Sequence, residues 1–184
     1  AGTSASPAVA LPPVWTTNGS EHLIAWAARR LESGHYGREL LVARVGLDGT
    51  LLDPTARALD HSLLLKPWVG SDGDGFAVAW QSQTTSTGTS ELRVAFLASD
   101  LHVVAGPLTL AATSTSGPML VGWHGRYEIV WEWPTGTIHR ASYAADGTSL
   151  VGDEILPVTS ATDIACDDAV CRVLGSCGTS CPTL

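Results

Sequence analysis

Lysine is almost absent from this chain, and other features common in globular proteins are missing as well. Lys66 is the only lysine, and no stretch shows the long pattern of Ala, Glu, Lys and Leu that is typical of helices. No apolar run reaches the roughly 18 residues that a membrane-spanning helix needs. We therefore expect a β-rich chain without a membrane span.

Basic charge is scarce too. The chain has 10 Lys and Arg against 18 Asp and Glu, which gives a formal net charge of −8. A nucleic acid is therefore not an expected partner, because binding to its backbone needs clustered cations. The motifs GxSxG, HExxH, GxxxxGK and GxGxxG do not occur. Accordingly, the sequence predicts no cofactor and no catalytic residue.

What the chain does contain is an internal repeat. GSEHLIAW ends at Trp26, GDGFAVAW at Trp80 and HGRYEIVW at Trp131, and a weaker copy, DDAVCRVL, ends at Leu174. The intervals between these end points are 54, 51 and 43 residues. A period near 50 with short strands is typical of the blades of a β-propeller.

A second repeated segment supports this interpretation. LLVARVGLDGTLL, LRVAFLASDLHVV and IHRASYAADGTSL carry an aspartate at the same place, namely Asp48, Asp100 and Asp146. In two copies the aspartate begins Asp-Gly-Thr, and Asp-Gly between apolar runs favours a tight turn. Each repeat therefore predicts four antiparallel strands, and the fold class is an all-β array of propeller type.

Alternation within the repeat predicts strands that are apolar on both faces. Phe76, Val78 and Trp80 share one face, and Ala77 and Ala79 share the other. Such strands need cover on both faces, which neighbouring blades would supply. A helix over residues 23–31 is the alternative. The aligned copies have Gln-Ser-Gln and Pro-Thr-Gly after the tryptophan, which do not continue a helix, so we predict a strand followed by a loop.

The repeat divides the chain into one repeat domain, 1–184. Its blades cover roughly 12–60, 61–112 and 113–158, a partial fourth covers 159–176, and a Cys-rich tail covers 177–184. An open array would leave sheet edges and an apolar blade face exposed. Three arrangements would cover these edges and this face. The N-terminal strand around residues 8–11 could complete a small four-bladed ring, a second chain could supply the missing blades, or the chain could be part of a longer propeller. We expect contact with another chain, identical or different, or with the rest of a parent propeller.

The four cysteines all fall within the last 19 residues, at Cys166, Cys171, Cys177 and Cys181. Their CxxxxC and CxxxC spacing, with no neighbouring His, does not match zinc knuckles, so we favour disulfides over a metal. Cys166 and Cys171 flank a position where the repeat places a hairpin turn, and Cys177 and Cys181 close a small loop. Four cysteines allow three connectivities.

The recurring pattern of Gly, apolar residues and Trp, followed by a segment ending in Asp-Gly-Thr, resembles the blades of secreted and surface-attached bacterial β-propeller proteins. The resemblance covers residues 8–174 and implies an extracytoplasmic location. In such repeats a cystine hairpin replaces the Gly turn, as at Cys166 and Cys171. The fourth repeat departs from the pattern, because Arg172 and Leu174 stand where Val78 and Trp80 stand in the second.

Only weak site candidates emerge. Asp72 and Asp74 in Ser-Asp-Gly-Asp-Gly look like the start of a calcium loop, but strand residues follow where ligands are needed, and a hairpin turn is favoured. The acidic pairs at 153–154 and 167–168 are expected in turns on a solvated rim. The six histidines form no close pair and are expected to be ordinary surface or strand residues.

Two tryptophans are candidate binding residues. Trp26, Trp80 and Trp131 repeat and are expected between blades, whereas Trp123 and Trp133 could stack on a sugar or anchor a partner. The resulting function is an extracytoplasmic scaffold or recognition module that binds protein or glycan. The alternative is a carbohydrate-active or other polymer-degrading enzyme that uses acidic residues in the propeller funnel.

Overall fold

The computed structural model describes residues 12–32, 35–62, 66–83, 90–112, 117–133, 136–167 and 171–176. Within these ranges the chain folds into strands joined by turns and contains no helix. No segment of this part of the chain could therefore cross a membrane as a long apolar helix. The prediction of an all-β fold with four-stranded antiparallel sheets is confirmed.

Three four-stranded antiparallel sheets follow one another along the chain, and a two-stranded sheet comes last. The first sheet consists of β1 (Val14–Thr17), β2 (Glu21–Glu32), β3 (His35–Gly46) and β4 (Arg57–Ser62). The second consists of β5 (Pro67–Ser71), β6 (Phe76–Gln83), β7 (Ser90–Leu97) and β8 (Val103–Ala111). The third consists of β9 (Met119–Trp123), β10 (Arg126–Glu132), β11 (Ile138–Ala144) and β12 (Ser149–Leu156). The fourth consists of β13 (Ser160–Cys166) and β14 (Cys171–Ser176).

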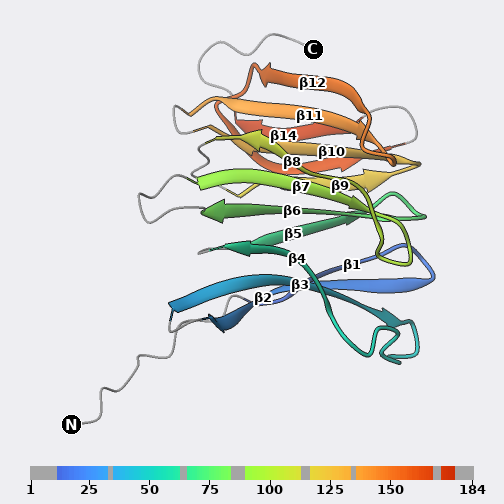
Figure 1. The fold of residues 1–184 in the computed structure, drawn as a ribbon. Helices are drawn as coiled ribbons and strands as arrows, with labels where there is room; N and C mark the ends of the chain where they lie inside the picture. The colour runs from blue at the N-terminus through green and yellow to red at the C-terminus, as the bar shows by residue number, and fades with distance from the viewer. Residues whose placement is uncertain are drawn as a thin grey trace.

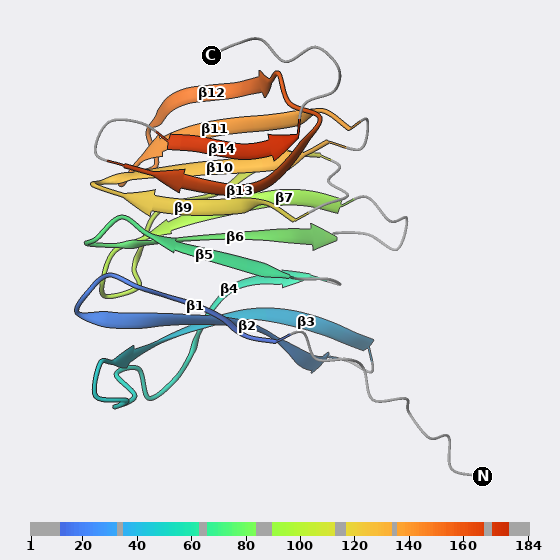
Figure 2. The same cartoon turned by 180° about the vertical axis from the view of Figure 1, so that it is seen from behind.

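The sheets are stacked in chain order. The first sheet lies at one end of the stack, and the third and fourth lie at the other (Figures 1 and 2). The first strands of consecutive sheets are neighbours: β1 lies beside β5, β5 beside β9, and β9 beside β13. The approach of β5 and β9 requires glycine, because a Cβ on Gly122 would lie 2.3 Å from the carbonyl oxygen of Ser71.

One hydrophobic core lies between the first and second sheets. Phe76, Val78 and Trp80 extend from β6 and pack against the smaller side chains of β2, which include Ala25. The other buried members of this core are Leu23, Leu40, Val42, Ala95, Leu97 and Leu101. The large face of β6 therefore covers the small face of the preceding sheet.

The next core repeats this arrangement between the second and third sheets. Ala77 and Ala79, on the small face of β6, meet the large side chains of β10. Those large side chains are Tyr127, Ile129 and Trp131. Because a sheet that is apolar on both faces needs cover on both, β6 is buried between two neighbours, as the alternation predicts.

The outer face of the first sheet has no such neighbour among the described residues. Ile24 and Trp26 stand where Val78 and Trp80 stand in the second sheet, yet both are only half-buried, whereas Trp80 is 0% and Trp131 1% exposed. The repeat therefore sets which face of the strand a tryptophan occupies. Its place in the stack sets whether that tryptophan is covered.

Two expectations about strand ends are wrong. The sequence predicts a loop directly after each repeated tryptophan, but β2 continues past Trp26 to Glu32 and pairs with β3 along its whole length. Likewise β6 continues to Gln83, which pairs with Ser90. Backbone pairing with the next strand extends these strands through residues whose side chains favour loops.

The alignment of the fourth repeat is also corrected. It places Leu174 level with Trp80, but Leu174 is 54% exposed, whereas Cys171 is buried and Val173 is half-buried. The faces of β14 are therefore shifted by one residue relative to the alignment. A shift of one residue exchanges the two faces of a strand, so Leu174 does not occupy the buried position of the repeated tryptophan.

Candidate functional site at the hairpin end of the stack

The best-defined surface lies along one side of the stack, on the right in Figure 1, where the strands of successive sheets end in turns. We call it the hairpin-end face. Its turns join β1 to β2, β3 to β4, β5 to β6, β7 to β8, β9 to β10 and β11 to β12. Most of the connections at the other end fall in ranges that the structure does not describe.

The β1–β2 and β5–β6 turns have the same hydrogen-bond pattern. In the first, Asn18 Oδ1 accepts from the N–H groups of Ser20 (3.0 Å) and Glu21 (2.9 Å). In the second, Asp72 Oδ1 accepts from the N–H groups of Asp74 (3.1 Å) and Gly75 (2.8 Å). The hydroxyls of Thr17 and Ser71 donate to the carbonyl oxygen four residues later in both turns.

This equivalence explains the presence of Asp72 in the β5–β6 turn. Asn18 accepts the same two backbone hydrogen bonds in the first sheet, so the turn requires a side-chain oxygen and not a negative charge. Asp72 is 5% exposed, and the Asp74 side chain is exposed. In the described parts of the chain, no three His, Cys, Asp or Glu side chains gather in a way that could hold a metal ion.

The predicted aspartate turns also share one geometry. Asp48, Asp100 and Asp146 each accept a hydrogen bond from the N–H two residues later, at 2.9, 3.0 and 2.9 Å. These bonds lower the pKa of each of the three carboxyls. The residue after the aspartate has positive φ, which glycine supplies in two copies and Leu101, with φ 65°, supplies in the third. Leu101 is only 3% exposed, so core packing offsets this strain.

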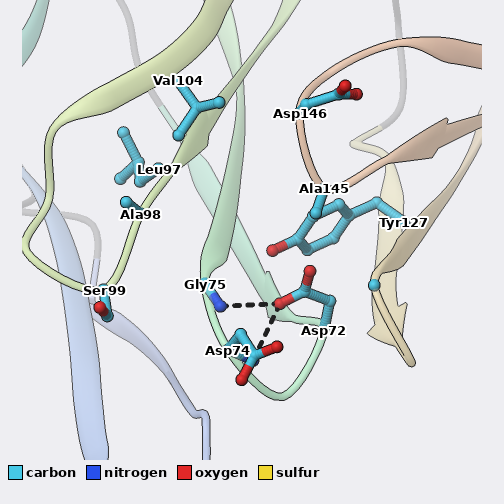
Figure 3. A pocket seen from close by; sticks show the side chains of 11 residues that line it. Asp72, Asp74, Gly75, Leu97, Ala98, Ser99, Val104, Tyr127, Ala145 and Asp146 are labelled. Carbon is cyan, nitrogen blue, oxygen red and sulfur yellow. Dashed lines mark hydrogen bonds between the residues drawn. The ribbon is translucent and has the colours of Figure 1, made fainter.

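A cavity of about 360 Å³ opens between the second and third sheets (Figure 3). Its walls are largely apolar, with Leu97 and Val104 on one side and Tyr127 and Ala145 on the other. Carboxylates stand around it on the turns, from Asp72 and Asp74 on one side and Asp146 on the other.

Tyr127 forms part of the wall of this cavity. Its side chain is buried, and burial raises the pKa of its hydroxyl well above the ordinary value, with the negative charge of Asp72 as the next cause. The hydroxyl therefore remains protonated at physiological pH. It can serve as a hydrogen-bond donor and cannot serve as a phenolate base.

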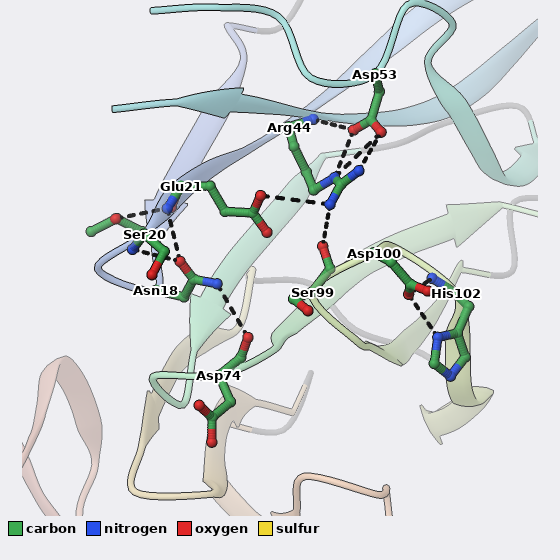
Figure 4. Close-up of polar contacts among 10 residues, drawn as sticks. Asn18, Ser20, Glu21, Arg44, Asp53, Asp74, Ser99, Asp100 and His102 are labelled. Atoms are coloured by element: carbon green, nitrogen blue, oxygen red, sulfur yellow. Dashed lines mark hydrogen bonds and ion pairs between the residues drawn. The ribbon is translucent and has the colours of Figure 1, made fainter. Parts of the chain in front are cut away.

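A polar network ties the first sheet to the second beside this cavity (Figure 4). The Arg44 guanidinium donates to Asp53 through Nε (3.0 Å) and Nη2 (2.8 Å), and through Nη1 to the carbonyl oxygen of Ser99 (2.8 Å). The bonds from Arg44 lower the pKa of Asp53. Asn18 Nδ2 donates across the sheets to the carbonyl oxygen of Asp74 (3.1 Å). A second open hollow, of about 400 Å³, lies among these residues.

The two candidate binding tryptophans do not come together. Trp123 ends β9 at the hairpin-end face, where it is half-buried and the Arg126 guanidinium lies 5.9 Å from its ring centre. Trp133 lies just beyond the other end of β10 and is also half-buried. Its ring packs 5.2 Å from that of His139. A single sugar or side chain could therefore contact only one of them.

Two buried polar groups were missed by the sequence analysis. His139 lies in a strand, as one of the two predicted alternatives has it, but its contacts were not foreseen: it is 8% exposed, Nδ1 lies 2.6 Å from Asp153, and its ring stacks on Trp131. Asp153 and Glu154, expected in a turn, lie within β12. They stand beside β11 in the sheet, and only the strand register could have revealed these contacts.

Glu128 is the second of these groups. It is 5% exposed and faces Arg140, whose Nε lies 3.6 Å from its carboxylate. Burial raises the pKa of Glu128, and the hydrogen bond with Ser142 and the charge of Arg140 only partly offset this effect. Arg140 also lies 3.4 Å from Glu154 on the neighbouring strand.

The cysteine prediction is confirmed where the structure describes it. Cys166 and Cys171 are directly opposite each other in the β13–β14 pair and form a disulfide. Asp167 lies between the two strands, as expected of a turn. Cys177, Cys181 and Asp168 lie outside the described residues.

Comparison with known proteins found no match for this chain. No protein-family model matches the chain, and no match was found among curated proteins or among solved structures.

Proposed function

We propose that the chain is a β-propeller-type array of three full blades and part of a fourth, and that it acts as an extracytoplasmic scaffold or recognition module. Three observations support the propeller arrangement: a repeat near 50 residues, sheets stacked in chain order, and neighbouring first strands. Similarity to secreted and surface-attached bacterial propeller proteins is part of this proposal. The ligand would be a protein or a glycan.

The observation that carries the proposal is that hydrogen bonds connect the hairpin ends of different sheets. Asn18 bonds to Asp74, Arg44 bonds to Ser99, and the N–H of Gly125 donates to the carbonyl oxygen of Asp72 (3.4 Å). A face whose loops are held by one another loses little conformational entropy on binding. Such a face suits recognition.

The carboxylates of this face favour binding over catalysis. An acid catalyst of glycoside hydrolysis needs a raised pKa. The hydrogen bonds described above instead lower the pKa values of Asp48, Asp53, Asp100 and Asp146. These side chains are ionised at neutral pH, and the three exposed ones, Asp48, Asp100 and Asp146, act as fixed acceptors for donors on a ligand.

The disulfide supports the proposed compartment. Structural disulfides persist in oxidising environments such as the periplasm, the cell surface and the medium, and they are rare in the cytosol. Cys166–Cys171 links the two strands of the last described hairpin, and an extracytoplasmic location would keep this bond oxidised.

Binding arrays test the proposed function. The full chain is screened on an array of glycans and an array of extracellular proteins, and positive spots are repeated with Asp74→Arg and Ser99→Arg. Both residues are exposed on the hairpin-end face, and Thr109→Arg, on the exposed side of β8, is the matched control. We expect the unmodified chain and the Thr109→Arg control to bind a ligand that the two face variants no longer bind. The mass of that ligand should be the same before and after binding. Cleavage of a bound polymer would instead favour the enzyme.

A further inference from the structure

The outer face of the first sheet is an apolar surface that no described part of the chain covers. Trp15 is 66% exposed on it, and a hollow of about 260 Å³ is lined by Trp15, His22, Ile24 and Val45. In both views this sheet forms the end of the stack (Figures 1 and 2). Terminal repeats of stacked proteins normally carry a polar outer face for solubility, and this sheet does not.

The residues of this face are those that the second and third sheets use for packing. Ile24 corresponds to Val78 and Ile129, and Trp26 corresponds to Trp80 and Trp131. In both covered examples the large face receives a sheet with smaller side chains, and in the second sheet those are Ala77 and Ala79. The same side chains in the same register fit the same kind of cover.

We propose that this face docks a partner polypeptide that presents an antiparallel sheet with alanine at the contact. Alanine is specified because the large side chains of one sheet fill the space that small side chains leave on the next, and close packing allows few voids. The partner would sit on Ile24 and Trp26 as the small face of the second sheet sits on Ile129 and Trp131.

A second copy of this chain fits the face less well. The alanines of β2 and β6 are already buried inside the stack. The outer face of the fourth sheet, at the other end of the stack, carries exposed Asp163 and Arg172. Burying these charges against tryptophan would be costly. Pairing two first sheets would place large side chains against large ones.

An extended chain provides the test, which needs no knowledge of the natural partner. A copy of residues 67–118, comprising the second sheet and the link that follows it, is joined ahead of Ala1. In the control, Ala77→Glu and Ala79→Glu are introduced in the added copy only. Oxidation of Trp26 by hydroxyl radicals is then followed by mass spectrometry, with Trp131 in the same sample as the folding control.

We expect Trp26 to lose most of its labelling in the alanine-faced fusion and to keep it in the glutamate-faced fusion. Equal labelling of Trp26 in the two fusions would overturn the proposal. So would a dimer of the original chain in which Trp26 is already protected, because a second copy would then be the occupant.

A second measurement covers the case in which the fusions do not fold. The original chain should bind the dye ANS, and Ile24→Ser with Trp26→Ser should lose this binding with little change in melting temperature. Unchanged dye binding would mean that the face is not exposed, and the proposal would fail. Neither result depends on ligand binding at the hairpin-end face, so each proposal can fail alone.

Discussion

Single tryptophans report the arrangement of the sheets because the same residue recurs in different surroundings. Trp80 is fully buried, and its Nε1 donates to Asp60 of the preceding sheet at 2.6 Å. Trp15 is 66% exposed at the end of the stack. The repeat indicated that Trp80 packs between sheets, but the bond to Asp60 depends on how the sheets align and could not be predicted.

Trp80→Ala should therefore destabilise the fold strongly, by about 3–5 kcal/mol, as removal of a buried tryptophan typically does. Trp15→Ala is the matched control and should change the free energy of unfolding little. Urea denaturation of both variants measures the difference. Equal effects would show that Trp80 is not between two sheets.

The buried carboxyl of Glu128 should make stability depend on pH. Burial raises its pKa above the ordinary 4.5, so the folded chain binds this proton more tightly than the unfolded chain does. This group therefore stabilises the protein as the pH falls from above the raised pKa toward the unfolded value. Glu128→Gln should remove that contribution. The difference in stability, variant minus wild type, should therefore be more favourable to the variant at about pH 7 than at about pH 4.

Melting temperatures at the two pH values measure this effect, and Glu154→Gln provides the control. Glu154 also faces Arg140, but its side chain is 51% exposed. Because it is an exposed ion-pair partner, its replacement should change the melting temperature little. A Glu128 variant whose difference from wild type is the same at both pH values would contradict the raised pKa.

At the scale of the element, the turns were the most predictable part of the chain. Asp-Gly-Thr gave two of the three aspartate turns directly, and alignment gave the third, at Asp100, without glycine. Strand ends were less predictable, because β2 and β6 extend as far as their partner strands pair with them. Contacts such as that of Glu128 with Arg140, on neighbouring strands of the third sheet, require the strand register, which a single sequence does not contain.

The β5–β6 turn gives a test of what Asp72 does. Asp72→Ala should destabilise the chain by about 1–3 kcal/mol, because the part-buried N–H groups of Asp74 and Gly75 lose their acceptor. Asp72→Asn should be close to wild type, since Asn18 forms the same turn in the first sheet. Thermal unfolding with and without calcium measures both. Calcium-dependent stabilisation of wild type that Asp72→Asn abolishes would instead assign Asp72 and Asp74 to a metal.

The last hairpin gives a covalent test. Alkylation without reduction, followed by mass spectrometry, should find Cys166 joined to Cys171, which lie directly opposite each other in the strand pair. We also expect Cys177 joined to Cys181 and no free thiol in the chain. Four alkylated cysteines, or zinc bound in stoichiometric amount, would contradict the disulfide assignment.

At the scale of the whole molecule, the repeat predicted the number of strands in each sheet and the large and small faces that stack. It did not predict the shift of faces in β14, because one inserted or deleted residue exchanges the two faces without changing composition. Nor does it identify a ligand, since the turns that form the hairpin-end face consist of ordinary turn residues. The repeat encodes packing, and recognition depends on how neighbouring turns meet.

Hydroxyl-radical labelling of the tryptophans in the unmodified chain tests the stacked arrangement most directly. Trp26, Trp80 and Trp131 occupy one repeat position, so only the order of the sheets can make them differ. We predict that Trp80 and Trp131 are labelled slowest, Trp15 fastest, and Trp26 in between. Labelling of Trp80 or Trp131 as fast as that of Trp15, or of Trp26 as slow as that of Trp80, would contradict a stack with the first sheet at its open end.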